Sequence, residues 1–213
     1  MTRTEFEAKL ANRAVELGLD TTPQLLERLH VYFQLLTSWN PKINLTAVNL
    51  DELPTDAVDR LFMEPLSAAR FAPGTSRVID IGSGGGSPAI PFALASGAAQ
   101  LTMVESRSRK SVFLREASRA VAVPASVVTT RFEDAAQERS LRGAFDIVTV
   151  RAVRMEEEAL RVLSDFMAPE GSIFLFQPLH NAMPVTQLLK PGGLHPLTPN
   201  ACLQTLVKAP SQR

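Results

Sequence analysis

Cysteine and histidine are scarce in this 213-residue sequence, which contains one cysteine and three histidines. The single thiol of Cys202 excludes an internal disulfide framework, and we expect it to be buried. Because the histidines show no metal-ligand spacing, we predict no metal site. Long apolar runs are also missing: none approaches the ~20 residues of a membrane span, and residues 1–17 lack the apolar core of a secretion signal. We therefore expect a cytoplasmic protein without a membrane partner.

An excess of positive charge is missing as well. The 22 lysines and arginines are balanced by 22 aspartates and glutamates, so the formal net charge is zero. Proteins that bind nucleic acid through bulk electrostatics usually carry an obvious basic excess, so binding of that kind would depend on a local patch. The composition, 45% hydrophobic and 21% charged, is that of a soluble globular protein.

The first 72 residues have a helical pattern. Leu25, Leu29 and Phe33 recur at helical spacing, and Thr22 before Pro23 is a typical N-cap followed by proline at the first helical position. We expect this helix to end at Pro41 and a second helical stretch to cover residues 50–72. Residues 1–72 are therefore predicted to form a helical extension packed on the rest of the chain.

Residues 73–213 alternate between strand-like and helix-like segments. Apolar, partly β-branched runs occur at 78–81, 101–104, 125–129, 145–150 and 172–176, with helix-like segments such as 110–121 and 155–167 between them. This alternation predicts an α/β domain with a doubly wound, mostly parallel sheet, which binds ligands at the carboxyl ends of its strands. In the proline- and glycine-rich tail, we expect a turn at 190–196 (KPGGLHP) and a last strand at 203–209.

A glycine-rich loop lies in the segment VIDIGSGGGSPAIP, residues 78–91. It follows a predicted strand and precedes a helix expected to begin near Pro88. Glycine has no Cβ to hold a ligand away from the backbone, and the free N–H groups of the helix start face the same space. A plain tight turn would need fewer glycines, so we expect a small ligand here.

Two cofactor classes use such a loop. A dinucleotide fingerprint, G-x-G-x-x-G/A, fails at its third glycine, where Ser87 stands. An acid followed by x-G-x-G-x-G is met completely by Asp80, Gly82, Gly84 and Gly86. This second pattern resembles motif I of S-adenosylmethionine-dependent methyltransferases. In these enzymes the acid and the exposed backbone receive the amino-acid part of the cofactor.

Residues at the next two strand ends fit the rest of a nucleoside. Glu105 follows the second strand about twenty residues after the glycines, where a carboxylate can accept hydrogen bonds from both ribose hydroxyls. A surface glutamate is the alternative. After the third strand, Glu133 or Asp134 could contact an adenine amino group and Phe132 could pack on its ring, or the segment could simply cap a helix.

Several separated segments together resemble one family. They read WNPKINLTAV (39–48), VIDIGSGGGSPAIP (78–91), VESRSRKSVFLREA (104–117), RFED (131–134) and FDIVTVRAV (145–153). The combination, over residues 25–176, is similar to the RsmG family, also called glucose-inhibited division protein B. The resemblance implies a class I S-adenosylmethionine methyltransferase fold and methylation of a guanine N7 in small-subunit ribosomal RNA. It also implies naked RNA or the assembled small subunit as partner.

The family's cofactor contacts, carried over by position, fall on Gly82, Ser87, the pair Phe132–Glu133 and Arg151. Arg151 is also the predicted catalytic residue, because the end of the fourth strand is where substrate and cofactor would meet. The full set of predicted cofactor-binding residues is Asp80, Gly82, Gly84, Gly86, Ser87, Glu105, Phe132, Glu133 and Arg151.

The expected chemistry needs no general base, because guanine N7 carries a lone pair and no proton. Alignment of the reactants would supply most of the catalysis. For RNA, the predicted contacts lie on a helix expected to start near Ser108, where Arg115 and Arg119 share a face; a solvated helix face is the alternative. The predicted RNA-binding residues are Arg109, Lys110, Arg115 and Arg119, with Arg107 beside them.

The sequence also departs from the family pattern. Leu61 and Glu64 stand where histidine and aspartate are usual, and Gln177–Pro178 stands where lysine and glycine are usual. These departures leave open a non-catalytic member that binds the cofactor or the ribosome. A nicotinamide-dependent oxidoreductase is the other alternative, opposed by Ser87 and by the absence of a catalytic Tyr–Lys or His pair.

Overall fold

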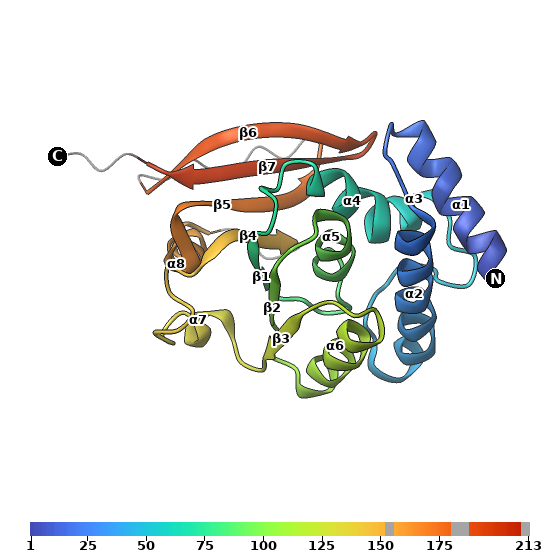
Figure 1. The fold of residues 1–213 in the computed structure, drawn as a ribbon. Coiled ribbons are helices and arrows are strands. Elements are labelled where there is room, and N and C mark those ends of the chain that lie inside the picture. The colour runs from blue at the N-terminus through green and yellow to red at the C-terminus, as the bar shows by residue number, and fades with distance from the viewer. Residues whose placement is uncertain (152–155, 180–187, 210–213) are drawn as a thin grey trace.

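The computed structural model describes residues 1–151, 156–179 and 188–209 (Figure 1). Ala152 and Val153 of the family-like segment, and His180, lie outside these residues. The helical elements are α1 (Arg3–Glu16), α2 (Pro23–Ile43), α3 (Thr55–Val58), the π-helix η1 (Asp59–Met63), α4 (Glu64–Ala69), α5 (Ala89–Ser96), α6 (Ser108–Ala120), α7 (Phe132–Ala135) and α8 (Glu157–Phe166). The strands are β1 (Arg77–Ile81), β2 (Gln100–Val104), β3 (Ala125–Val128), β4 (Phe145–Arg151), β5 (Met167–Pro178), β6 (Leu189–Thr198) and β7 (Ala201–Lys208).

The seven strands form one sheet in the order β3-β2-β1-β4-β5-β7-β6. The pairs from β3 to β5 are parallel, while β7 runs antiparallel to both β5 and β6. The chain reverses its direction across the sheet between β1 and β4, so the carboxyl ends of these two strands border a ligand-binding crevice. The predicted doubly wound, mostly parallel α/β fold is confirmed.

Helices cover both faces of the sheet (Figure 1). Successive side chains of a strand point to opposite faces, so Val78 belongs to the core under α2, α4, α5 and α6, and Ile79 to the core under α7 and α8. The first of these cores also contains Phe6 and Leu10 of α1 and Tyr32 of α2. The N-terminal helices therefore share one continuous core with the sheet.

The start of α2 confirms the predicted cap, because the Thr22 side chain accepts a hydrogen bond from Leu25 N at 3.2 Å. The predicted end at Pro41 is wrong, since the helix continues to Ile43. Proline lacks only its own N–H, and the last turn is closed instead by Asn44, which donates to the Asn40 carbonyl from a left-handed conformation (φ 52°). The second helical stretch begins at Thr55, later than expected.

The segment 190–196, predicted as a turn, lies within strand β6. This strand is at the edge of the sheet, where proline can be accommodated because one side of the strand has no ladder partner. Its pairing with β7 shifts register at Pro191/Gly193 and again at Pro196/Thr198, so the prolines and glycines occur at bulges. The predicted last strand is confirmed as β7, in which Cys202 is buried as expected.

Candidate functional site

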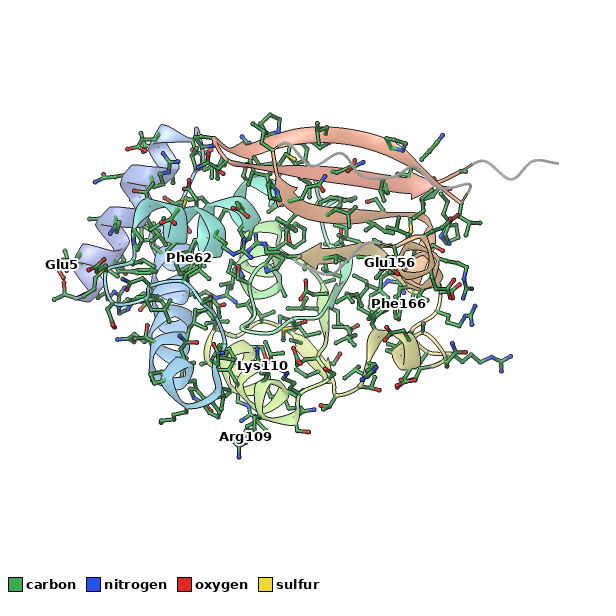
Figure 2. All side chains as sticks on the ribbon, turned by 180° about the vertical axis from the view of Figure 1, so that it is seen from behind. Glu5, Phe62, Arg109, Lys110, Glu156 and Phe166 are labelled. Atoms are coloured by element: carbon green, nitrogen blue, oxygen red, sulfur yellow. The ribbon has the colours of Figure 1, made fainter. Side chains whose placement is uncertain are left out.

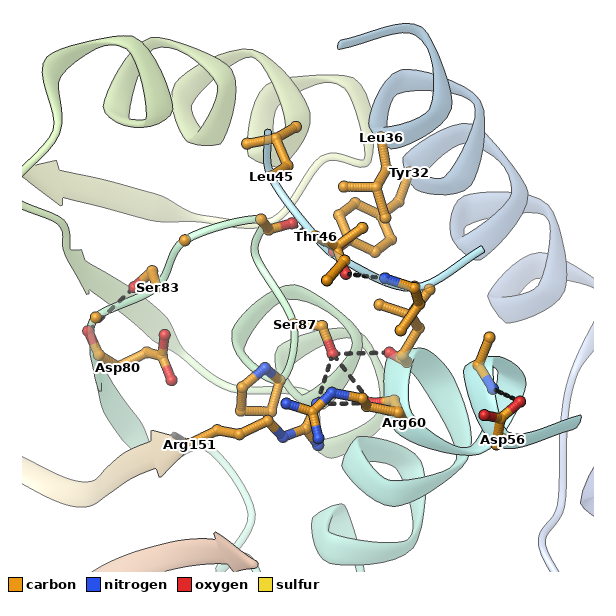
Figure 3. A pocket seen from close by; sticks show the side chains of 18 of the residues that line it. Tyr32, Leu36, Leu45, Thr46, Asp56, Arg60, Asp80, Ser83, Ser87 and Arg151 are labelled. Carbon is orange, nitrogen blue, oxygen red and sulfur yellow. Dashed lines mark hydrogen bonds between the residues drawn. The ribbon is translucent and has the colours of Figure 1, made fainter. Parts of the chain in front are cut away.

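A cavity of about 620 Å³ lies at the carboxyl ends of β1 and β4, above the glycine loop. Its floor is the loop itself, and α2, the segment 44–49 and η1 form its other sides (Figure 3). Of the predicted cofactor-binding residues, those lining this cavity are Asp80, Gly82, Gly84, Ser87 and Arg151. Strands β1 and β4 are direct neighbours, so the fold brings the first and last of these residues together across 71 positions of sequence.

The glycines of the loop serve two purposes. Gly82 and Gly84 have φ of 72° and 52°, and a Cβ on Gly84 would meet only the Gly82 carbonyl oxygen, at 3.7 Å. Their bare backbone borders the cavity. Gly86, with φ of 88°, is different, because a Cβ there would come within 2.9 Å of the Ile90 side chain and 3.3 Å of the Tyr32 ring. The missing side chain at Gly86 allows close packing of the loop against α2 and α5.

The loop is fixed from two sides by hydrogen bonds. Glu105, which is 7% exposed at the end of β2, accepts from Gly84 N at 2.9 Å and from Arg107 N at 2.8 Å, one bond to each carboxylate oxygen. Each of these oxygens has a second lone pair that can accept from a ligand. From the opposite side, the buried Tyr32 hydroxyl donates to the Gly85 carbonyl at 2.6 Å. Glu105 borders the loop but does not line the cavity.

Asp80 is a buried carboxylate with an incomplete set of partners. It is 1% exposed, and its Oδ1 accepts from the Thr149 hydroxyl of β4 at 2.6 Å. Its Oδ2 is buried and has no hydrogen-bond partner. Removal from water disfavours the charged form, and this burial raises the pKa of Asp80 from 3.8 to about 6. A cationic ligand group in the cavity would satisfy both the charge and the unpaired oxygen.

Arg151 lies at the end of β4 and is held by three groups. Its Nη2 donates to Glu64 Oε2 at 2.7 Å, and its Nη1 donates to the Arg60 carbonyl at 2.6 Å and to Ser87 Oγ at 3.2 Å (Figure 3). Its guanidinium also lies 4.9 Å from the centre of the Phe176 ring. The side chains of the ion pair are 8% and 11% exposed, and burial lowers the pKa of Arg151 to about 10 and raises that of Glu64.

The cavity wall contains residues that the sequence reasoning missed. The segment 44–49 folds over the glycine loop, and the Asn40 side chain holds it by accepting from Leu45 N at 2.8 Å and Thr46 N at 2.9 Å. Residues 44–48 of this segment belong to the family-like stretch 39–48, which carried the resemblance but did not predict where the segment lies in the fold. On the far wall, Ser87 Oγ donates to the Leu61 carbonyl of the π-helix at 2.9 Å. The π-helix thus directs two carbonyls, those of Arg60 and Leu61, toward the site.

The predicted adenosine contacts lie outside the cavity. Phe132 and Glu133 begin helix α7 after β3, where Phe132 is half-buried against the second core and Glu133 is exposed. Glu105 lies between this position and the cavity, at the end of the intervening strand β2. The contacts proposed for one elongated ligand are therefore ordered along the edge of the sheet, from β3 through β2 to β1 and β4.

The predicted RNA-binding residues all lie on α6. Arg109 and Lys110 are in its first turn (Figure 2), and Arg109 and Arg119 are exposed. Arg115 has a structural contact, since its Nη2 donates to the Val127 carbonyl at 3.1 Å and to Thr129 Oγ1 at 2.9 Å. Arg115 therefore ties α6 to strand β3, whereas the other three side chains have no hydrogen bond or ion pair with the residues that the structure describes.

A second cavity, of about 470 Å³, adjoins the first. It is bordered by the end of β5, the turn between β6 and β7, and the helical segment from α3 to α4. The residues lining both cavities are Val48, Asp56, Arg60 and Arg151. Among the residues that the structure describes, no cluster of His, Cys, Asp or Glu could hold a metal ion, and no helix is both long and apolar enough to cross a membrane.

Comparison with known proteins gives a consistent result. A family model described as "rRNA small subunit methyltransferase G" (GidB) matches residues 25–188. A protein of that full name, Ribosomal RNA small subunit methyltransferase G, from Clostridium botulinum (strain Alaska E43 / Type E3) is 32% identical over 169 residues, or 78% of this chain and 67% of its own. Its namesake from Chromobacterium violaceum is 33% identical over 169 residues, or 79% of this chain and 78% of its own.

Solved structures resemble the fold at lower sequence identity. A SAM dependent methyltransferase from Aquifex aeolicus superposes with a TM-score of 0.57 at 10% identity, covering 75% of this chain and 96% of that one. A putative methyltransferase, yhhF, from Escherichia coli gives a TM-score of 0.50 at 19% identity, covering 64% of this chain and 77% of that one. Both likenesses concern the arrangement of the sheet and its helices.

Proposed function

This chain belongs to the rRNA small subunit methyltransferase G family, and from that membership we propose that it methylates N7 of a guanine in small-subunit ribosomal RNA, with S-adenosylmethionine as the cofactor. The substrate is the RNA or the assembled small subunit, and the protein works in the cytoplasm. The observation that carries the proposal is the unpaired, buried Asp80 oxygen beside the bare backbone of Gly82 and Gly84.

The residues of the site fit the proposed cofactor. S-adenosylmethionine has a cationic amino-acid end, and Asp80 offers a carboxylate with a free oxygen in the cavity that this end would enter. The absent side chain of Gly84 lets the amino-acid end of the cofactor approach the backbone of the loop. The spare lone pairs of Glu105 suit two ribose hydroxyls, and Phe132 and Glu133 lie one strand further, where the adenine would reach.

In this mechanism the protein acts mainly by alignment. When bound, S-adenosylmethionine supplies a sulfonium methyl group that becomes bonded to N7 as its bond to sulfur breaks, so no proton has to be removed from the guanine. Arg151, fixed by Glu64, Ser87 and the Arg60 carbonyl, forms a rigid wall where the two cavities meet. A rigid wall that holds reacting groups in near-attack geometry lowers the barrier by several kcal/mol.

The proposal is tested by two measurements on the purified protein. Calorimetry should show binding of S-adenosylmethionine at ~100 μM or below, and the protein should transfer labelled methyl to small subunits from a strain that lacks its gene. Nucleoside mass spectrometry should then identify 7-methylguanosine as the product. Stabilisation by NADH without any by S-adenosylhomocysteine would instead support the oxidoreductase. Unchanged 7-methylguanosine in small-subunit RNA of the deletion strain would support the non-catalytic alternative.

The glycine loop gives a first mutational prediction. Gly84→Val is expected to weaken S-adenosylmethionine binding at least tenfold, or about 1.4 kcal/mol, because a branched side chain would occupy the space that the ligand needs. The φ of 52° adds strain for a residue other than glycine. Calorimetry measures the affinity, and Gly97→Val is the control, since Gly97 has a similar φ of 65° with open space around it, remote from the cavity. Equal affinity of Gly84→Val and the unsubstituted protein would show that the loop does not contact the cofactor.

The basic residues of α6 give a second prediction. The double variant Arg109→Gln/Lys110→Gln is expected to lower the slope of log affinity for small-subunit RNA against log salt concentration by about 1.4, at ~0.7 for each lost phosphate contact. Filter binding at several salt concentrations measures the slope. The control Arg139→Gln/Lys190→Gln removes the same two residue types from exposed positions, in the turn between α7 and β4 and on β6. If the salt dependence of RNA binding is the same in both double variants, Arg109 and Lys110 do not contact RNA phosphates.

A further inference from the structure

The second cavity adjoins the proposed cofactor cavity and shares part of its lining. Asp56, Arg60 and Arg151 border both spaces, and Figure 3 shows Arg60 and Arg151 side by side at this boundary. Beyond them, the second cavity is lined by Phe176 and Gln177 of β5 and by the β6–β7 turn. Its volume of about 470 Å³ exceeds what a single nucleobase requires.

Charge in the second cavity favours an uncharged ring over a phosphate group. Its lining contains three carboxylates and two guanidiniums. The Arg151 guanidinium is already neutralised by Glu64 at 2.7 Å, and Asp59 is paired with Arg13 at 2.7 Å. A phosphate binds where several free cations converge, whereas among the described residues of this cavity the charges outside an ion pair are one guanidinium, Arg60, and one carboxylate, Asp56. An uncharged base from an unstacked RNA strand fits this balance of charges better than a phosphate does.

The second cavity offers two unpaired acceptors, on Asp56 and Gln177, beside the donors of Arg60 and the unpartnered Arg151 Nε. Asp56 is exposed; within the described residues it accepts one hydrogen bond, from Ala57 N, and forms no ion pair. Gln177 Nε2 donates to Gln204 Oε1 at 2.8 Å, which leaves the Gln177 carboxamide oxygen without a donor in the described part of the chain. Guanine presents N–H donors at N1 and N2, whereas adenine has an acceptor at N1.

Resting on the function proposed above, we propose that the second cavity is the subsite for the target guanine, with Asp56 and Gln177 accepting hydrogen bonds from its Watson–Crick edge. The imidazole ring that carries N7 is at the other end of the purine. A base held by its N1 and N2 groups in the second cavity therefore directs N7 back toward the cavity of Asp80 and the glycine loop. The same acceptors repel the N1 lone pair of adenine, so the subsite selects guanine.

The test compares Asp56→Asn with the matched control Asp51→Asn. The asparagine at 56 can still accept from Ala57 N, so the fold is retained, but it replaces an acceptor-only carboxylate with a group that also donates. Asp51 is an exposed aspartate that lines neither of the two cavities. For Asp56→Asn we expect at least a tenfold fall in kcat/KM for methyl transfer to undermethylated small subunits, with S-adenosylmethionine affinity within twofold of the unsubstituted protein. Asp51→Asn should change neither quantity.

A binding measurement addresses the subsite without turnover. With the protein saturated by S-adenosylhomocysteine, saturation-transfer NMR should detect 7-methylguanosine but not adenosine, and Asp56→Asn should abolish the signal. Full activity of Asp56→Asn would contradict the proposed subsite, and so would a fall in cofactor affinity as large as the fall in kcat/KM. Neither result would contradict the proposed function. If the unsubstituted protein binds the cofactor but transfers no methyl to guanine, the proposed function itself fails, and the subsite with it.

Discussion

Arg151→Ala is expected to lower the free energy of unfolding by about 3–5 kcal/mol and to abolish methyl transfer. The substitution removes one partner of an ion pair whose side chains are 8% and 11% exposed, so the Glu64 carboxylate is left buried without its cation. It also removes the hydrogen bonds to Ser87 Oγ and to the Arg60 carbonyl. Urea denaturation followed by circular dichroism measures the stability, and transfer of labelled methyl measures the activity.

A double variant separates the structural from the functional part of this loss. In Arg151→Met/Glu64→Leu the buried charges are gone together, and replacement of a buried pair by apolar groups is often neutral for stability. We therefore expect the double variant to regain most of the unfolding free energy but no activity, because the wall between the two cavities has lost its guanidinium. If the free energy of unfolding of Arg151→Ala is within 1 kcal/mol of that of the unsubstituted protein, the Arg151–Glu64 pair does not contribute as a buried ion pair. Recovery of activity in the double variant would show that Arg151 has no part in the reaction.

Asp80 is expected to make both stability and cofactor binding depend on pH. Its folded-state pKa of about 6 lies above the ordinary value of 3.8, so the folded protein holds a proton that the unfolded chain has lost between these two values. Stability therefore falls as the pH rises from about 4 to 6, by up to about 3 kcal/mol, and stays at the lower level above pH 6. Affinity for the cationic end of the cofactor should move the other way, rising as Asp80 ionises.

Asp80→Asn removes this titration. Above pH 6 the variant should be more stable than the unsubstituted protein, with weaker S-adenosylmethionine binding that no longer changes between pH 5 and 7.5. Urea denaturation and calorimetry across this range measure the two quantities, and Asp51→Asn, which removes an exposed carboxylate, should follow the unsubstituted profile. A cofactor affinity in Asp80→Asn that still rises with pH would assign the titration to another group.

Much of the fold could be predicted from the sequence because its signals are local. The runs 78–81 and 101–104 match strands β1 and β2 to within one residue, since apolar, partly β-branched residues bounded by turn formers specify a buried strand. The glycine loop was recognisable for the same reason. The segment 190–196 was misread because proline and glycine usually break strands. Only its position at the sheet edge, a property of the whole fold, makes them compatible with β6.

Individual site residues could be predicted from the sequence, but the contacts between them could not. Asp80 and Arg151 were identified from motifs, but the partner of Arg151 is Glu64, 87 residues away, and no local pattern connects them. The family pattern has aspartate where this chain has Glu64, so the side chain that pairs with Arg151 is acidic in both. Asp56 was not singled out at all, because an exposed aspartate near a helix start is ordinary in sequence and acquires meaning only from the cavities around it.

The hydrogen bond from Tyr32 to Gly85 links the cofactor loop to the helix that carries much of the N-terminal core. Since Phe6 of α1 and Phe92 of α5 belong to that same core, α1 and α2 cannot detach without exposing the underside of the loop. We infer that the helices and the sheet form one cooperative unfolding unit. Binding energy gained at the loop then raises the free energy of opening the whole unit, so a bound cofactor should slow amide exchange in α1, which does not line the cofactor cavity.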